Sequence, residues 1–184
     1  MAISSAWNGK ESEIILGIGL CPLSGNEKGP APELKEGEDI IDECIRIYRF
    51  NSSMRSFPVK GGADRTLVYL TVYMNWFIKK LENITTKKEA FIFADEQALK
   101  QELKPEEKNH FFAGLLLPAK KIEDSDKFKK YLKQLRSELS RRLIERLYST
   151  EESHSFDYVF WLGLSRRSFM SLRYDPDIGA AKKI

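Results

Sequence analysis

The stretch ADRTLVYLTVYMNWFIKKL, residues 63–81, decides how this chain folds. An acidic residue, Asp64, lies near its start, two lysines lie near its end, and the side chains between leave almost no polar side. The run contains no glycine or proline and is longer than an ordinary strand, and its terminal charges suit the dipole of a helix. The sequence therefore predicts an apolar central helix at about 63–82, which the rest of the fold or a partner must cover on most sides.

Other segments carry helical patterns and are expected to surround this central helix. They comprise a helix from about 40 to 51 that Asp39 caps, a segment at 86–104, a helix at 125–148 that Ser125 caps, and a segment at 155–172. The apolar run 111–117 fits either a buried strand-like connector or a short helix. Prolines and glycines in the first 38 residues predict an extended arm, and residues 175–184 read as a loose tail. The expected architecture is thus all-α, with about five helices in a single domain over residues 1–184.

Charge is unevenly distributed along the chain. Residues 1–43 carry nine acidic and three basic side chains, although the whole chain has a net charge of +3. An acidic arm ahead of a basic body suits charged partners. Solubility, or pairing of the arm with the body, explains the same pattern.

The segment 125–148 has the pattern of a surface helix. Its apolar residues recur at helical spacing: Phe128, Leu132, Leu135, Leu139, Leu143 and Leu147. Lysines and arginines occupy the other faces. These cations could simply be solvated, could contact an acidic protein, or could bind nucleic acid; nucleic acid is the least favoured, because aromatic residues do not alternate with the basic ones.

The sequence offers no grouping of residues typical of catalysis. The two histidines, His110 and His154, are not placed at metal-ligand spacing, and neither a nucleophile elbow nor a phosphate-binding loop occurs. We therefore expect no enzymatic activity, no metal and no cofactor. Cys21 and Cys44 are expected to be buried thiols in a reducing cytosol. No signal-like leader or membrane-spanning run is recognised, so a cytoplasmic protein without a membrane partner is expected.

Several blocks resemble the family of actin-related protein 2/3 complex subunit 3, the 21-kilodalton subunit. They are KGPAP at 28–32, DIIDECI at 39–45, ADRTLVYLTVY at 63–73 with KKL at 79–81, YLKQLRSELSRRL at 131–143, and, more weakly, SRRSFM at 165–170. The resemblance implies a helical subunit without enzymatic activity in a seven-subunit assembly that nucleates branched actin filaments. It also implies actin-related proteins and the other subunits as partners, the actin filament as a partner through the complex, and a place in the actin cytoskeleton.

Two sets of residues are candidate partner contacts. The arm contributes Lys28, Pro30 and Pro32. The two prolines limit the conformational entropy that the arm loses when it becomes ordered. The basic helix contributes Lys129, Lys130, Lys133 and Arg136, which are expected to face an acidic partner surface unless they only solvate the helix. The alternative function is an independent helical module that binds nucleic acid or an acidic peptide through the helix 125–148.

Overall fold

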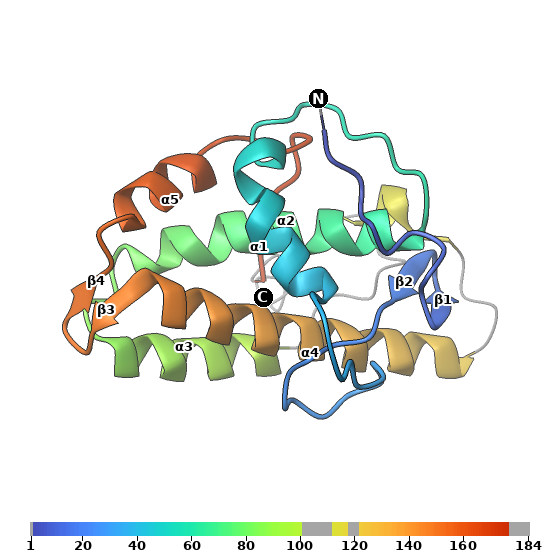
Figure 1. Ribbon diagram of the computed structural model, residues 1–184, viewed down its shortest axis with the longest axis horizontal. Coiled ribbons are helices and arrows are strands. Elements are labelled where there is room, and N and C mark those ends of the chain that lie inside the picture. Colours follow the sequence, from blue (N-terminus) through green and yellow to red (C-terminus); the bar gives the residue numbers. More distant parts are fainter. Residues whose placement is uncertain (1, 101–111, 118–121, 177–184) are drawn as a thin grey trace, which may run out of the picture.

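Helix α2, Gly62–Leu81, runs through the middle of the fold, as Figure 1 shows. The computed structural model describes residues 2–100, 112–117 and 122–176. Within α2 only Lys79 and Lys80 are exposed, while Arg65 and Trp76 are half-buried. Three other helices and strand β2, Ile18–Leu20, pack against α2. The prediction of an apolar central helix at 63–82 is confirmed, and its cover comes from the chain itself.

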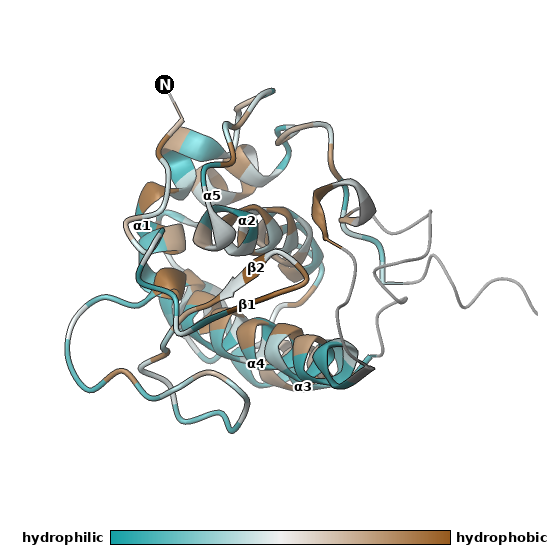
Figure 2. Ribbon diagram, turned by 90° about the vertical axis from the view of Figure 1, so that its right-hand side faces the viewer, coloured by the Kyte–Doolittle hydropathy of each residue, from teal (hydrophilic) through white to brown (hydrophobic). Residues whose placement is uncertain are grey.

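The helices around α2 are α1, Ile40–Asn51; α4, Ile122–Leu147; and α5, Tyr158–Ser165. Helix α3, Lys87–Leu99, packs mainly on α4, and the two lie side by side in Figure 2. Asp39 caps α1 as predicted, because its side chain accepts hydrogen bonds from the backbone N–H groups of Ile41 and Asp42. The run 111–117 contains a short 3₁₀ helix at Ala113–Leu115, the second of its two predicted forms.

The expectation of a purely all-α fold is wrong, because two small antiparallel hairpins accompany the helices. Strands β1, Glu13–Ile15, and β2 pair within the N-terminal arm, and β3, Tyr148–Thr150, pairs with β4, Ser153–His154, between α4 and α5. Leu16 and Gly17 connect the first hairpin with φ angles of 49° and 88°. Two positive φ angles in a two-residue turn match the twist of paired strands, so a glycine suits the second position. The fold is therefore mostly helical rather than all-α.

The predicted surface helix at 125–148 is in fact buried over much of its length. From Tyr131 to Ser140 only Lys133 is exposed. Helix α3 covers one side of α4, α2 covers another, and the N-terminal arm crosses a third. The leucine stripe was placed correctly in the core, but the polar residues beside it meet protein instead of water. Ser125 lies inside α4 and not at its cap, because the helix begins at Ile122.

Two other helix ends differ from the predicted ones. Helix α3 ends at Leu99, since Lys100 adopts an extended ψ of 128°; the rest of the predicted segment, 101–104, lies outside the described residues. Helix α5 is shorter than the predicted 155–172 and ends at Ser165. Beyond it Met170 and Ser171 have φ angles of 52° and 56°, which no helix accommodates. Most of the predicted loose tail, residues 177–184, also lies outside the described part.

The N-terminal segment closes the start of α2. The N-cap residue Gly61 has no side chain to offer, so the orphan backbone N–H groups of the first turn need other acceptors. Ala63 N donates to Glu11 Oε1 at 2.9 Å, and Asp64 N donates to Asn8 Oδ1 at 3.1 Å. In return the buried Asp64 accepts from Ser5 N at 2.7 Å. Residues 2–12 are therefore part of the fold and not a free extension.

Candidate interaction surface

The extended arm is fastened to α4 by polar side chains spaced one turn apart. Gln134 Nε2 donates to the carbonyl of Glu27 at 2.9 Å, and its Oε1 accepts from Ala31 N at 3.0 Å. One turn later, Glu138 Oε1 accepts from Glu27 N at 2.7 Å. The arm passes so close that a Cβ on Gly29 would lie 2.3 Å from the Gln134 side chain. The arm is thus ordered against the body, with a glycine at this close approach.

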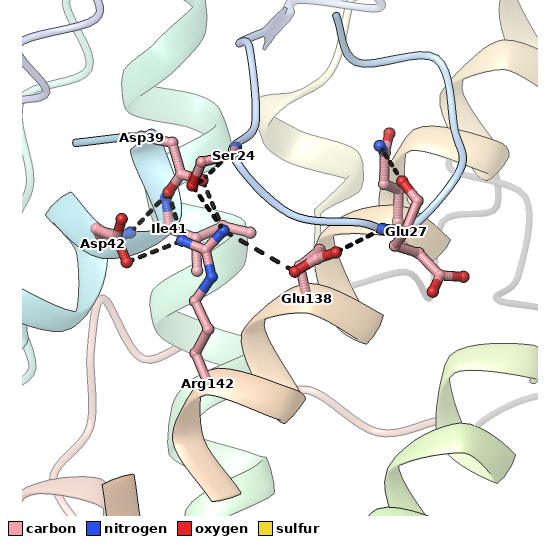
Figure 3. Close-up of polar contacts among 8 residues, drawn as sticks. Ser24, Glu27, Asp39, Ile41, Asp42, Glu138 and Arg142 are labelled. Carbon is pink, nitrogen blue, oxygen red and sulfur yellow. Dashed lines mark hydrogen bonds and ion pairs between the residues drawn. The ribbon is translucent and has the colours of Figure 1, made fainter. Parts of the chain in front are cut away.

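Arg142, one turn beyond Glu138, joins three elements in one ion cluster. Its guanidinium donates to both oxygens of Asp39 at 2.7 Å and to Asp42 at 2.8 Å. Asp39 also accepts from the N–H and hydroxyl of Ser24, each at 2.9 Å. Figure 3 shows Arg142 reaching from α4 to the start of α1, with Ser24 of the arm beside Asp39. We call this set, Ser24, Asp39, Asp42 and Arg142, the Arg142 cluster.

The charge of Asp39 is stabilised within the Arg142 cluster. Burial raises the pKa of this carboxyl. The hydrogen bonds from Arg142 and from the N–H groups of Ser24 and Asp42 lower the pKa by more than burial raises it, so the pKa lies below its usual range. The paired carboxylate therefore serves as helix cap, arm anchor and counter-ion at once.

The arm residues predicted as partner contacts lie on its outer side. Lys28 and Pro32 are exposed, and Pro30 is half-buried. The carbonyl of Pro32 accepts from Leu23 N at 2.9 Å, which closes the intervening loop on itself. These residues are presented to the solvent by a loop of fixed shape.

The basic residues predicted on α4 divide into two groups. Lys129, Lys130 and Lys133 are exposed, and we call them the lysine face. Arg136 is only 3% exposed; its guanidinium donates to the Tyr69 hydroxyl at 2.9 Å and to the carbonyl of Ala98 at 3.2 Å. The expectation that Arg136 shares the surface of the lysines is not met, because it joins α4 to α2 and α3. Arg136 comes one helical turn after Leu132, beside the leucine stripe, and this spacing indicates a position that faces the interior.

A groove that the sequence reading missed lies between α1, α4 and α5. It encloses about 1080 Å³ and is lined by arginines of α1 and α4 and by Phe160 and Trp161 of α5. In Figure 1, α5 lies at the upper left, α1 near the centre, and α4 crosses the molecule below them. The lining residues of each helix form no unusual sequence pattern by themselves, so only the packing of the three helices reveals the groove. The exposed Val159 lies in the first turn of α5, and the exposed Phe156 lies in the turn just before that helix.

The described residues contain no arrangement typical of catalysis or metal binding. Within these ranges no three potential metal ligands come together. Cys21 and Cys44 are buried and unpaired with each other, as expected, and burial raises the pKa of Cys44 to about 12. His154 lies between the rings of Tyr148 and Tyr158, whereas His110 lies outside the described part. No helix within the described ranges is both long and apolar enough to cross a membrane.

Comparison with known proteins gives consistent matches over most of the chain. The model of the family P21-Arc, described as the ARP2/3 complex ARPC3 (21 kDa) subunit, matches residues 1–173. Actin-related protein 2/3 complex subunit 3 of Saccharomyces cerevisiae is 34% identical over 153 residues, which cover 83% of this chain and 86% of the relative. The Arabidopsis thaliana protein of that name is 33% identical, covering 85% and 88%. The Schizosaccharomyces pombe protein is 33% identical, covering 84% and 87%.

Proposed function

Because this chain belongs to the family of actin-related protein 2/3 complex subunit 3, we propose that it is a non-catalytic structural subunit of that complex and supports the nucleation of branched actin filaments. The match over residues 1–173 carries this proposal. The mostly helical fold around one buried helix agrees with what the resemblance implied. Nothing in the comparisons supports the alternative of an independent module for nucleic acid or acidic peptide.

A subunit of this kind acts through fixed geometry. Association of free actin-like subunits costs translational and rotational entropy, and a scaffold that holds them in place in advance removes much of that cost. The chain suits the task because its arm is held down by the Arg142 cluster and its N-terminal segment by α2. Its partners would be the actin-related proteins and the other subunits, with the actin filament contacted through the complex, in the cytoplasmic actin cytoskeleton.

Co-purification tests this function directly. A tagged copy of the full chain is isolated from native extract, and its partners are identified by mass spectrometry and gel filtration. We expect it to migrate with actin-related proteins in an assembly several times larger than its own 21.3 kDa. Migration as a free chain that nucleic acid shifts would refute the proposal and restore the alternative.

The proposed contacts to partners are the outer arm residues Lys28, Pro30 and Pro32 and the lysine face. The exposure of these side chains supports them, whereas Arg136 belongs to the interior. Reversing all three charges of the lysine face to Glu should weaken incorporation into the complex, and more so at low salt, since exposed charges are screened. The matched control reverses Lys10, Lys60 and Lys88, which are exposed elsewhere. Unchanged assembly and branching at physiological salt would remove the lysine face from the interface.

A further inference from the structure

The groove between α1, α4 and α5 is lined by five arginines and by three acidic residues, Asp42, Glu145 and Asp157. Three of its five arginines already have acidic partners: Arg46 pairs with Glu38, Arg141 with Asp95, and Arg142 belongs to the Arg142 cluster. The other two, Arg49 and Arg146, are exposed and form no ion pair with any residue that the structure describes. Asp157 in the same groove attracts Arg146, but neither guanidinium group is held in an ion pair within the described residues, so both can receive a carboxylate from outside.

Aromatic rings hold these two guanidinium groups in place. Arg49 lies 4.5 Å from the ring centroid of Phe50, and Arg146 lies 5.0 Å from that of Trp161. Trp161 is itself fixed, since it stacks on Tyr48 with centroids 5.6 Å apart and its Nε1 donates to Asp157 at 2.9 Å. A guanidinium stacked on a ring keeps its N–H edge open to a carboxylate, and its preorganisation reduces the entropy lost on binding.

An apolar row continues the groove along α5. Phe156 is fully exposed at 104%, Val159 is 76% exposed, and Phe160, which lines the groove, is 56% exposed. Val159 and Phe160 lie in the first turn of α5, and Phe156 lies in the turn that leads into this helix. These three exposed side chains make up the apolar row. Aromatic residues beside arginines are the composition enriched at interface centres, and subunits that remain assembled cover such apolar surface permanently.

From this geometry we infer that the groove and the apolar row form a docking face for an acidic segment with apolar anchors on another subunit of the same assembly. Apolar side chains of that segment lie on Phe156, Val159 and Phe160, and its carboxylates pair with Arg49 and Arg146. The inference rests on the proposed function. The docking face is built from other residues than the lysine face and the outer arm residues.

Incorporation into the complex tests the docking face. Tagged full-length variants are expressed in cells that lack the native copy. Another subunit of the complex is then pulled down, and the amount of each variant is measured relative to that subunit. The variants Arg49→Glu/Arg146→Glu and Phe156→Ala/Phe160→Ala should each lower incorporation by about tenfold or more. The charge-retaining Arg49→Lys/Arg146→Lys should stay within about threefold of the wild type, because it keeps the cations and loses only the fork geometry. Matched controls, Lys60→Glu/Lys88→Glu and Ile92→Ala, should incorporate like the wild type.

The fold of each variant is checked by the thermal unfolding of the isolated chain. Phe156 contributes nothing to the core, so Phe156→Ala alone serves as the variant that cannot act through misfolding. Wild-type incorporation of both groove variants would overturn the docking face and leave the proposed function intact. A dimer of the isolated chain that the groove variants abolish would overturn it too, since the occupant would then be a second copy. If the wild type itself were absent from the complex, the proposed function would fail.

Discussion

At the scale of single residues, Arg142 is the side chain that connects the arm to two helices of the body. It neutralises the fully buried Asp39, reaches Asp42 and contacts Ser24, so α1, α4 and the arm meet at one guanidinium. A buried ion pair adds little net stability when intact, but removing one partner leaves an uncompensated charge. The loss of stability on removing Arg142 therefore comes mainly from the buried charge of Asp39, which would have no counter-ion.

Arg142→Ala should lower the free energy of unfolding by about 3 kcal/mol, because Asp39 would remain buried without its cation. Urea titration followed by circular dichroism measures the change. The control is Arg141→Ala, whose ion pair with Asp95 is 3.5 Å long and exposed on both sides; its cost should not exceed about 1 kcal/mol. Equal costs for the two neighbours would contradict the role given to the Arg142 cluster.

At the scale of elements, the start of α2 depends on a segment more than fifty positions earlier in the chain. A helix leaves its first backbone N–H groups without internal partners, and here Asn8 and Glu11 accept two of them in place of an N-cap side chain. The negative charge of Glu11 also suits the positive end of the helix dipole. The central helix of the fold thus begins on acceptors that its own sequence does not contain.

Asn8→Ala and Glu11→Ala should each destabilise the chain by about 1 kcal/mol, as loss of a side-chain cap does. Thermal unfolding measures both, and the exposed neighbour Lys10→Ala should stay within about 0.5 kcal/mol of the wild type. Removing residues 1–11 should cost more than the two substitutions together, since the buried Asp64 and Glu43 would also lose the donors Ser5 and Ala6. A truncated chain as stable as the full one would show that the segment does not cap α2.

At the scale of the whole molecule, interior and partner surface are separate. Helix α2 is covered by its own chain, so its apolar residues specify the core and do not form a docking face. The candidate contacts all lie outside it, on the arm, on α1, on α4 and at the start of α5. Substitutions in α2 and substitutions on these outer elements should consequently fail in different ways.

Leu70→Asn should unfold the subunit instead of releasing it folded from its partners. Leu70 is fully buried, and a cavity together with an amide without partners costs about 4 kcal/mol or more, against a total stability of roughly 5–15 kcal/mol. Loss of helical circular dichroism should therefore accompany loss of incorporation. Leu99→Asn, at an exposed position, should keep the helical signal. A soluble and fully folded Leu70→Asn chain that had lost only its partners would contradict this separation.

Elements with a strong local pattern were predictable from the sequence. The apolar run of α2, the Asp39 cap of α1 and the leucine stripe of α4 each follow from spacing and residue type within one segment. The short hairpins were missed because strands of two or three residues carry too little pattern to be distinguished from a loop. The end of α5 was predicted too late in the chain. Met170 and Ser171, beyond this helix, have positive φ angles that their residue types do not predict.

The candidate surface was predictable only in part, and for a different reason. A basic residue on a helix has the same sequence signature whether it meets water or a neighbouring carbonyl, so Arg136 was grouped with Lys129, Lys130 and Lys133. The groove was invisible because its arginines and aromatics come from helices far apart in the chain.

The sequence by itself determined the central helix, the segments that surround it, the absence of any catalytic grouping and the resemblance to one family. These rest on residue type and spacing, which act over a few turns of chain. The tertiary structure alone decided which polar groups are inside and which surfaces remain open. It buried Arg136, anchored the arm through Arg142, and left Arg49 and Arg146 outside any ion pair among the described residues, near an exposed apolar row. Burial and charge neutralisation depend on what packs against a side chain, and that partner lies elsewhere in the sequence.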